Sequence, residues 1–212
     1  GAVSSRRVMV LRYLKKIGAN LNQGTIDGFS PAHLAASHGD VDMLWELKDL
    51  GVDLNHVNKD GYSPAHTAAN DGQIAVLKLL KDLGADLNKG SNHGSTPAYI
   101  AARNGHVEVL KELKALGANI DQENINGWTP AFIAIQKNHI DVLRTLKELG
   151  IDLNEPNHQG CTPVFIAAQE GQIEALRLLN SYGCDLMIDF ISSQKALNDF
   201  SKKKIGRASC RE

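Results

Sequence analysis

Residues 60–72 of the chain read DGYSPAHTAANDG, in which an Asp-Gly pair precedes Ser-Pro and a short run of alanine. Similar phrases return at residues 28–36 (GFSPAHLAA), 94–102 (GSTPAYIAA), 127–135 (GWTPAFIAI) and 160–168 (GCTPVFIAA). Five of the six prolines belong to these phrases and lie at intervals of 33 residues, at positions 31, 64, 97, 130 and 163. A period of this length indicates a stack of structural repeats.

The order of residue types within one repeat predicts two helices. Ser63, like the Ser or Thr before each of the other prolines, can accept a hydrogen bond from the free amides of a helix start, and proline at the first helical position loses no bond. The glycine eight residues later ends this first helix, and Asn138 takes its place in the fourth repeat. A second, amphipathic helix is predicted at residues 107–117 (VEVLKELKALG) and its counterparts. Its apolar stripe consists of Leu110, Leu113 and Leu116.

The segments between repeats predict hairpin turns. Residues 84–94, GADLNKGSNHG, are rich in Asn, Asp and Gly, which favour tight turns. Each unit is therefore expected to consist of helix, turn, helix and hairpin. Because one such unit cannot bury its own apolar face, the units must stack, and the predicted fold class is an all-α repeat solenoid.

At these residues the sequence resembles the ankyrin-repeat family, whose 33-residue unit carries a Gly-x-Thr-Pro-Leu-His-x-Ala-Ala phrase and a Gly-Ala-Asp-x-Asn close. His33 and His66 match the histidine of the phrase, and residues 84–88 match the close. The chain departs from the phrase at Ala32, Ala65, Ala98 and Ala131, which replace leucine, and at Tyr99, Phe132 and Phe165, which replace histidine. The resemblance implies an ankyrin-type stack of helix-turn-helix units joined by β-hairpin-like loops.

We predict four segments along the chain. Residues 1–24 form an N-terminal half-repeat that caps the stack, because residues 8, 11, 14 and 17 are apolar and fall in register with the second helices. Residues 25–189 form five 33-residue ankyrin repeats. Residues 190–205 form a C-terminal capping helix, and residues 206–212 are a tail that is disordered or was added for expression.

Composition narrows the classes of function. The net charge of the 212 residues is -1, so there is no bulk field to attract nucleic acid or acidic lipid. The three cysteines are sparse, and the sequence shows no signal peptide, no Asn-x-Ser/Thr acceptor and no apolar run long enough to span a membrane. We therefore expect an intracellular protein, cytoplasmic or nuclear, that binds no nucleic acid and does not insert into membranes.

No group of residues predicts catalysis. A tetrahedral metal site needs three or four converging ligands, and the eight histidines and three cysteines form no such cluster in the sequence. Cys161 has no activating base next to it, and a Gly-rich phosphate loop is absent. We therefore predict no metal, no cofactor, no small-molecule substrate and no enzymatic activity.

The resemblance implies that another protein or peptide binds in a concave groove, lined by the hairpin tips and the first helices. Large aromatic residues follow the turn glycine in three repeats, at positions that we expect to be reachable from solvent, and such residues are frequent at interface hot spots. The alternative is that each ring packs locally on its neighbouring hairpin. The candidate partner-binding residues are Phe29, Tyr62, Trp128, Asp27, Asp60, His93, Asn126 and Arg103.

Other surface features have less specific interpretations. A row of lysines on the second helices, with interleaved acidic residues, predicts a solvated ridge; it consists of Lys48, Lys81, Lys114 and Lys147. Trp45 is either an isolated exposed ring or a second contact site. Two alternative functions stay open: the chain is the recruitment arm of a larger enzyme or effector, or it is the substrate of an asparaginyl hydroxylase at the hairpin residues Asn22, Asn55, Asn88 and Asn154.

Overall fold

The computed structural model describes residues 2–184, with side chains from residue 8 onward, and this part of the chain forms eleven α-helices and no β-strand. Helix α1 (Ala2–Lys16) stands alone, and five pairs of a first and a second helix follow it. The pairs are α2 (Pro31–His38) and α3 (Val41–Asp49), α4 (Pro64–Asn70) and α5 (Ile74–Asp82), α6 (Pro97–Arg103) and α7 (Val107–Ala115), α8 (Pro130–Gln136) and α9 (Ile140–Glu148), α10 (Pro163–Gln169) and α11 (Ile173–Ser181).

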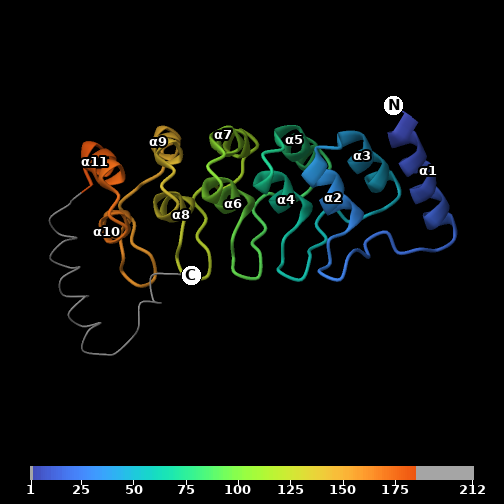
Figure 1. Ribbon diagram of the computed structural model, residues 1–212, viewed down its shortest axis with the longest axis horizontal. Coiled ribbons are helices and arrows are strands. Elements are labelled where there is room, and N and C mark those ends of the chain that lie inside the picture. Colours follow the sequence, from blue (N-terminus) through green and yellow to red (C-terminus); the bar gives the residue numbers. More distant parts are fainter. Residues whose placement is uncertain (1, 185–212) are drawn as a thin grey trace.

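The helix pairs stack side by side into an elongated solenoid. Figure 1 shows the second helices in one row, the first helices in a row beneath it, and the hairpin loops projecting beyond the first helices. Successive first helices make the most extensive contacts between repeats. The predicted fold class, an all-α solenoid of helix-turn-helix units, is therefore confirmed.

The helix boundaries follow the predicted signals. Each first helix begins at one of the periodic prolines, after a Ser or Thr in extended conformation, and the hydroxyl of Thr96 accepts a hydrogen bond from the N–H of Tyr99 at 3.2 Å. Left-handed backbone follows the helix, with φ of +73° at Gly72. Asn138, at φ 60°, is the one residue other than glycine with positive φ among the described residues, as its position in the repeat predicts.

The core lies between the two rows of helices. The second helices contribute the predicted leucine stripe, in which Leu110 and Leu113 are fully buried. The first helices contribute alanines at the position where the family phrase has leucine, and these are at most 1% exposed. The small side chains Ala32, Ala65, Ala98 and Ala131 allow neighbouring first helices to pack closely.

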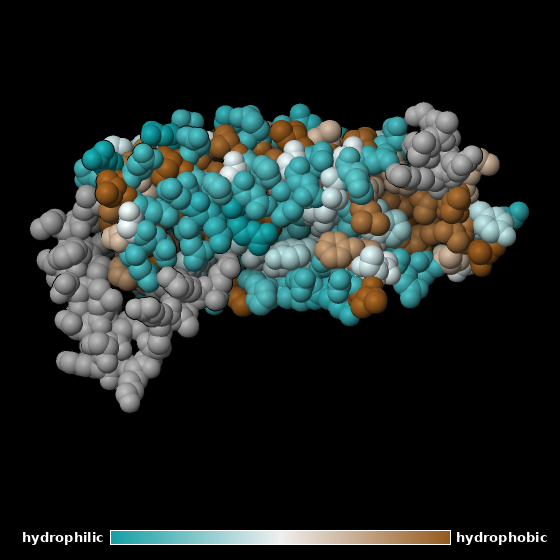
Figure 2. Space-filling view, in the orientation of Figure 1, coloured by the Kyte–Doolittle hydropathy of each residue, from teal (hydrophilic) through white to brown (hydrophobic). Residues whose placement is uncertain are grey.

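Helix α1 has the place of a second helix at the end of the stack. Val8, Leu11 and Leu14 pack against the core, as their register predicts, whereas Ile17 is 60% exposed. Met9, Val10 and Tyr13 are exposed too, and Figure 2 shows an apolar area at this end of the molecule. The division of the chain into a half-repeat and five repeats stays a prediction, and residues 190–205 and 206–212 lie outside the described residues.

Asparagine side chains link successive repeats. The Oδ1 atoms of Asn22, Asn55 and Asn88 accept hydrogen bonds from backbone N–H groups of the following repeat, at 3.0, 2.9 and 2.7 Å. The next position in this row is Asp121, and within residues 8–184 no such bond joins its side chain to the following repeat. Burial, together with the negative charges of Asp152, Glu155 and Glu123, raises the pKa of Asp121 to about 6.

We expect Asp121→Asn to raise the free energy of unfolding at neutral pH by about 1 kcal/mol or more, because it adds one hydrogen bond and removes a charge that the fold disfavours. An amide can accept the N–H of Asp152 without placing a charge beside other carboxylates. Because folding raises the pKa of Asp121 from 3.8 to about 6, the folded state binds this proton more tightly, and stability falls as pH rises through that window. The advantage of the variant should therefore shrink as pH falls below 6.

Urea unfolding of both proteins across this pH range measures the effect. The matched control is Asn88→Asp, which places a carboxylate at the preceding position of the same row and should lower stability at neutral pH. An advantage of Asp121→Asn that does not change with pH would show that charge is not its cause.

Candidate functional site

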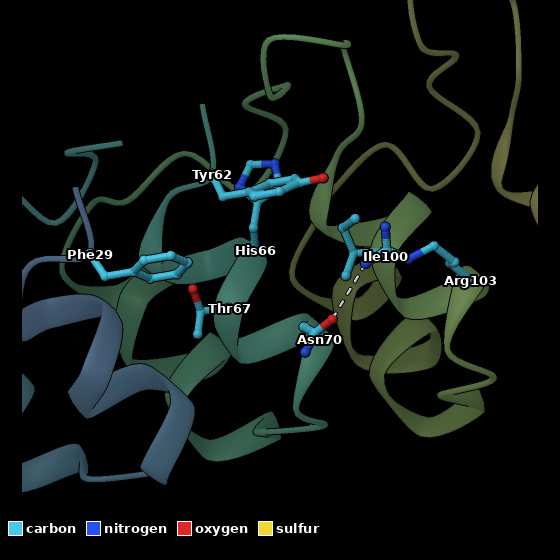
Figure 3. A pocket seen from close by; sticks show the side chains of 7 residues that line it. All are labelled: Phe29, Tyr62, His66, Thr67, Asn70, Ile100 and Arg103. Carbon is cyan, nitrogen blue, oxygen red and sulfur yellow. Dashed lines mark hydrogen bonds between the residues drawn. The ribbon is translucent and has the colours of Figure 1, made fainter. Parts of the chain in front are cut away.

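Side chains from three consecutive repeats line a hollow of about 190 Å³. The hairpin tips contribute two aromatic residues, α4 contributes three residues and α6 contributes two. Figure 3 shows the hollow extending from Phe29 at one end to Arg103 at the other, with Thr67 below the ring of Phe29. The lining residues are Phe29, Tyr62, His66, Thr67, Asn70, Ile100 and Arg103.

Thr67 helps to explain why space is left at this place. Its counterparts one repeat before and one repeat after are Leu34 and Ile100, and the later repeats have isoleucine there. Threonine is smaller than leucine or isoleucine, so α4 fills less of the space next to the rings of Phe29 and Tyr62. The small size of Thr67 is therefore one reason why space is left here.

The three predicted aromatic residues differ in how much of their side chain is exposed. Phe29 and Tyr62 are half-buried, and their rings contact His33 and His66 at centroid distances of 5.6 and 5.3 Å. Trp128 occupies the same repeat position but is only 3% exposed. The expectation that Trp128 is reachable from solvent is wrong, because its ring packs into the core against Phe132, at a centroid distance of 5.7 Å.

Polar residues three positions before the turn glycine hold the hairpin tips. Asn58 Oδ1 accepts hydrogen bonds from the N–H groups of Asp60 and Tyr62, at 3.0 and 2.9 Å, and Asn124 does the same for Asn126 and Trp128. Sequence reasoning missed this role. The available signal was a polar residue that recurs every 33 residues, at Thr25, Asn58, Ser91, Asn124 and Asn157.

The backbones of predicted tip residues form hydrogen bonds with the next repeat, and their side chains are exposed. The carbonyls of Asp27, Asp60 and His93 accept hydrogen bonds from N–H groups of the following hairpin, at 3.0, 2.9 and 3.1 Å. Gly61 has φ of +82°, and a Cβ atom there would lie 2.5 Å from the backbone nitrogen of Asn92. The side chains of Asp27, Asp60, His93 and Asn126 are exposed at the tips and do not line the hollow.

His66 connects the hollow to the start of α4. Its Nδ1 atom accepts a hydrogen bond from the N–H of Ser63 at 3.1 Å, so the proton lies on Nε2, which donates to the carbonyl of Ser95 at 2.8 Å. His33 has the same arrangement one repeat earlier. These bonds need a neutral imidazole, and burial lowers the pKa of both rings, that of His66 to about 4.

We expect His66 to make the protein less stable in acid. Because folding lowers its pKa from 6.5 to about 4, the unfolded chain binds the proton first, so stability present above pH 6.5 is lost as pH falls toward 4. The loss from this residue amounts to at most about 3 kcal/mol. Urea unfolding across this pH range should show a smaller loss for His66→Tyr, which introduces the residue found at the same position as Tyr99. An equal loss in both proteins would contradict this assignment.

Two further histidines join the first helices of one repeat to the second helix of the next. Nε2 of His106 bonds the carbonyl of Asn70 at 2.9 Å, and Nε2 of His139 bonds the carbonyl of Arg103 at 3.0 Å. Within the residues that the structure describes, no three His, Cys, Asp or Glu side chains are placed to hold a metal ion. None of the described helices is both long and apolar enough to cross a bilayer.

The polar end of the hollow carries a positive charge. Nη2 of Arg103 lies 3.5 Å from Oδ1 of Asn70, which is a long contact. Among the described residues, no carboxylate forms an ion pair with Arg103. The neighbouring Asp71 instead accepts hydrogen bonds from Ser37, at 2.6 Å, and from Asn70, at 2.7 Å.

The other predicted surface features lie on the second helices, away from the hollow. Lys48, Lys81 and Lys114 are exposed, and Nζ of Lys147 lies 5.9 Å from the centre of the Tyr182 ring. Trp45, on α3, is 53% exposed.

Since Trp128 is part of the core, we expect Trp128→Ala to lower the free energy of unfolding by about 3–5 kcal/mol, as for other large-to-small core substitutions. Phe29→Ala, at the same repeat position but half-buried, should cost less. Denaturant unfolding of the two variants compares them. A Trp128→Ala protein as stable as the parent would show that the ring is not held in the core.

A family model described as ankyrin repeats, which contains three copies of the repeat, matches the chain twice, at residues 32–124 and 99–189. Together the two matches extend from residue 32 to residue 189. A comparison with curated proteins gives no match.

Proposed function

The chain belongs to the ankyrin-repeat family, whose model matches more than half of it, and we propose that it is a non-catalytic module that binds a partner protein or peptide. Ankyrin repeats are in general protein–protein interaction modules. The contact surface in this proposal is the concave groove formed by the hairpin tips and the first helices. The hollow lined by Phe29 and Tyr62 is the observation that supports it.

The two rings have the properties of anchor residues. Each presents aromatic surface that is only half-buried, and each is fixed from behind by a histidine that is itself held by hydrogen bonds. Such a ring loses little conformational freedom when a partner covers it, and aromatic side chains are enriched among the residues that dominate binding energy. The rigid repeats therefore present a surface that is already shaped for binding.

The size of the hollow supports a protein or peptide partner. Its volume of about 190 Å³ is below the roughly 300–1,000 Å³ that is usual for small-molecule sites. It has room for one side chain of a larger ligand. Asp27, Asp60, His93 and Asn126 at the tips and Arg103 in the hollow are the proposed polar contacts, and Trp128 supports the surface from within. We place this function inside the cell, in the cytoplasm or nucleus.

We expect Tyr62→Ala to weaken binding of the partner at least about tenfold, which corresponds to about 1.4 kcal/mol, because it removes an anchor at the centre of the contact. Its melting temperature should fall by no more than about 2–4 °C, the shift that corresponds to about 1 kcal/mol in a chain of this length. An affinity pull-down with mass spectrometry identifies the partner, and calorimetry with the purified partner gives the dissociation constant.

The control variants are Lys81→Ala and Lys114→Ala, which remove exposed charges from the second helices and should change affinity much less. The proposal fails if these lysine variants lose the partner while Tyr62→Ala and Phe29→Ala still bind it normally. The contact surface would then be on the second helices.

A further inference from the structure

The backbone of Arg103 is fixed, whereas none of the residues that the structure describes neutralises its guanidinium. The backbone carbonyl accepts a hydrogen bond from His139 of the next repeat at 3.0 Å, and within residues 8–184 the guanidinium makes only the 3.5 Å contact with Asn70. A guanidinium has five N–H donors, so most of them are available to a ligand. The carboxylate of Asp71, which directly follows Asn70 in the chain, accepts hydrogen bonds from the neutral donors Ser37 and Asn70.

The rest of the hollow is mostly apolar. The rings of Phe29 and Tyr62 and the side chain of Ile100 form its walls, and Thr67 forms its base. The hollow thus offers an apolar compartment at one end and an unpaired cation at the other. One residue of a ligand can fill the first while a neighbouring residue reaches the second.

The charges at the hairpin tips set the direction of the ligand. Asp27 and Asp60 are exposed, and within the described part of the chain neither pairs with a cation. An acidic group of the ligand is therefore repelled at the tip edge of the hollow and attracted at the Arg103 end. Lys59, also exposed at these tips, offsets one of the two negative charges and leaves the tip edge with a net charge of -1. This charge is opposite in sign to that of Arg103, which favours one orientation of a bound chain.

We propose that the hollow recognises a segment of the partner in which a bulky apolar side chain is followed closely by an aspartate or glutamate. The apolar side chain lies between Phe29 and Tyr62, and the carboxylate accepts two hydrogen bonds from the guanidinium of Arg103. Paired N–H donors match the two oxygens of a carboxylate, which a single ammonium group cannot do. This inference rests on the proposed function and specifies the chemistry of the partner.

The test uses a displayed library of random peptides as the probe and the whole chain as bait. We expect the enriched peptides to share a bulky apolar residue and a nearby acidic residue. The best peptide is then measured by calorimetry against the parent protein and against Tyr62→Ala, Arg103→Ala, Arg103→Lys and Lys137→Ala. Lys137 is an exposed cation that follows the next first helix and does not line the hollow, so it is the matched control.

We expect Arg103→Ala to weaken the peptide about tenfold or more, Arg103→Lys to weaken it less, and Lys137→Ala to change affinity less than about threefold. Replacing the acidic residue of the peptide by its amide should have the effect of Arg103→Ala, and the two changes together should weaken binding no more than either alone. Circular dichroism melting of Arg103→Ala shows whether the fold is retained.

The outcomes separate this inference from the proposed function. Enriched peptides that need Tyr62 but carry no acidic residue, or that bind Arg103→Ala as tightly as the parent, overturn the inference and leave the groove as the binding surface. Peptides whose affinity is unchanged by both Tyr62→Ala and Arg103→Ala bind elsewhere, and they contradict both the inference and the proposed function. A library that yields no enriched peptide also overturns the inference, because the hollow is preformed.

Discussion

Each repeat of this protein is completed by hydrogen bonds that the following repeat supplies. At the hairpin tip the carbonyl of Asp60 accepts a hydrogen bond from the N–H of Asn92, and between second helix and hairpin the side chain of Asn88 accepts one from the N–H of Asn119. At the end of α4 the carbonyl of Asn70 binds His106. All three bonds cross the same boundary, so the constant length of the repeat keeps tip, loop and helix in register together. The hollow depends on this constraint, because three successive repeats line it.

The elements could be predicted from sequence because their signals are local. A proline after Ser or Thr starts a helix, and a left-handed glycine ends it, whichever repeat surrounds them. Recurrence every 33 residues then separates a structural signal from chance, as for Asn138, which replaces glycine and adopts the same backbone conformation. The bonds between repeats were harder to foresee. They join residues about one repeat apart through atoms whose direction the sequence does not specify.

The burial of an individual side chain could not be predicted from the repeat pattern in the same way. The repeat places Phe29, Tyr62 and Trp128 at equivalent positions, yet Trp128 is buried and the other two are half-buried. Exposure depends on the volumes of the side chains that surround a residue, and these volumes differ from repeat to repeat. Thr67 is an example, since it is smaller than the leucine or isoleucine at the same position of the other repeats and leaves space in the hollow. Arg103 was a candidate from the sequence, whereas Thr67, Asn70 and Ile100 were not.

The distribution of charge distinguishes the two sides of the stack. On the second helices, cations lie near acids, as in the pairs Lys78 with Glu112 at 3.2 Å and Lys111 with Glu108 at 2.8 Å, and exposed pairs of this kind contribute little. Beside the hollow, Asp71, which follows Asn70 in the chain, accepts hydrogen bonds from the neutral donors Ser37 and Asn70 instead. A charge without a counter-ion, beside aromatic surface that partly excludes water, interacts more strongly with an incoming carboxylate than a paired one does. In the proposed function, specificity therefore depends less on how many charges the protein carries than on which of them are unpaired within the described part of the chain.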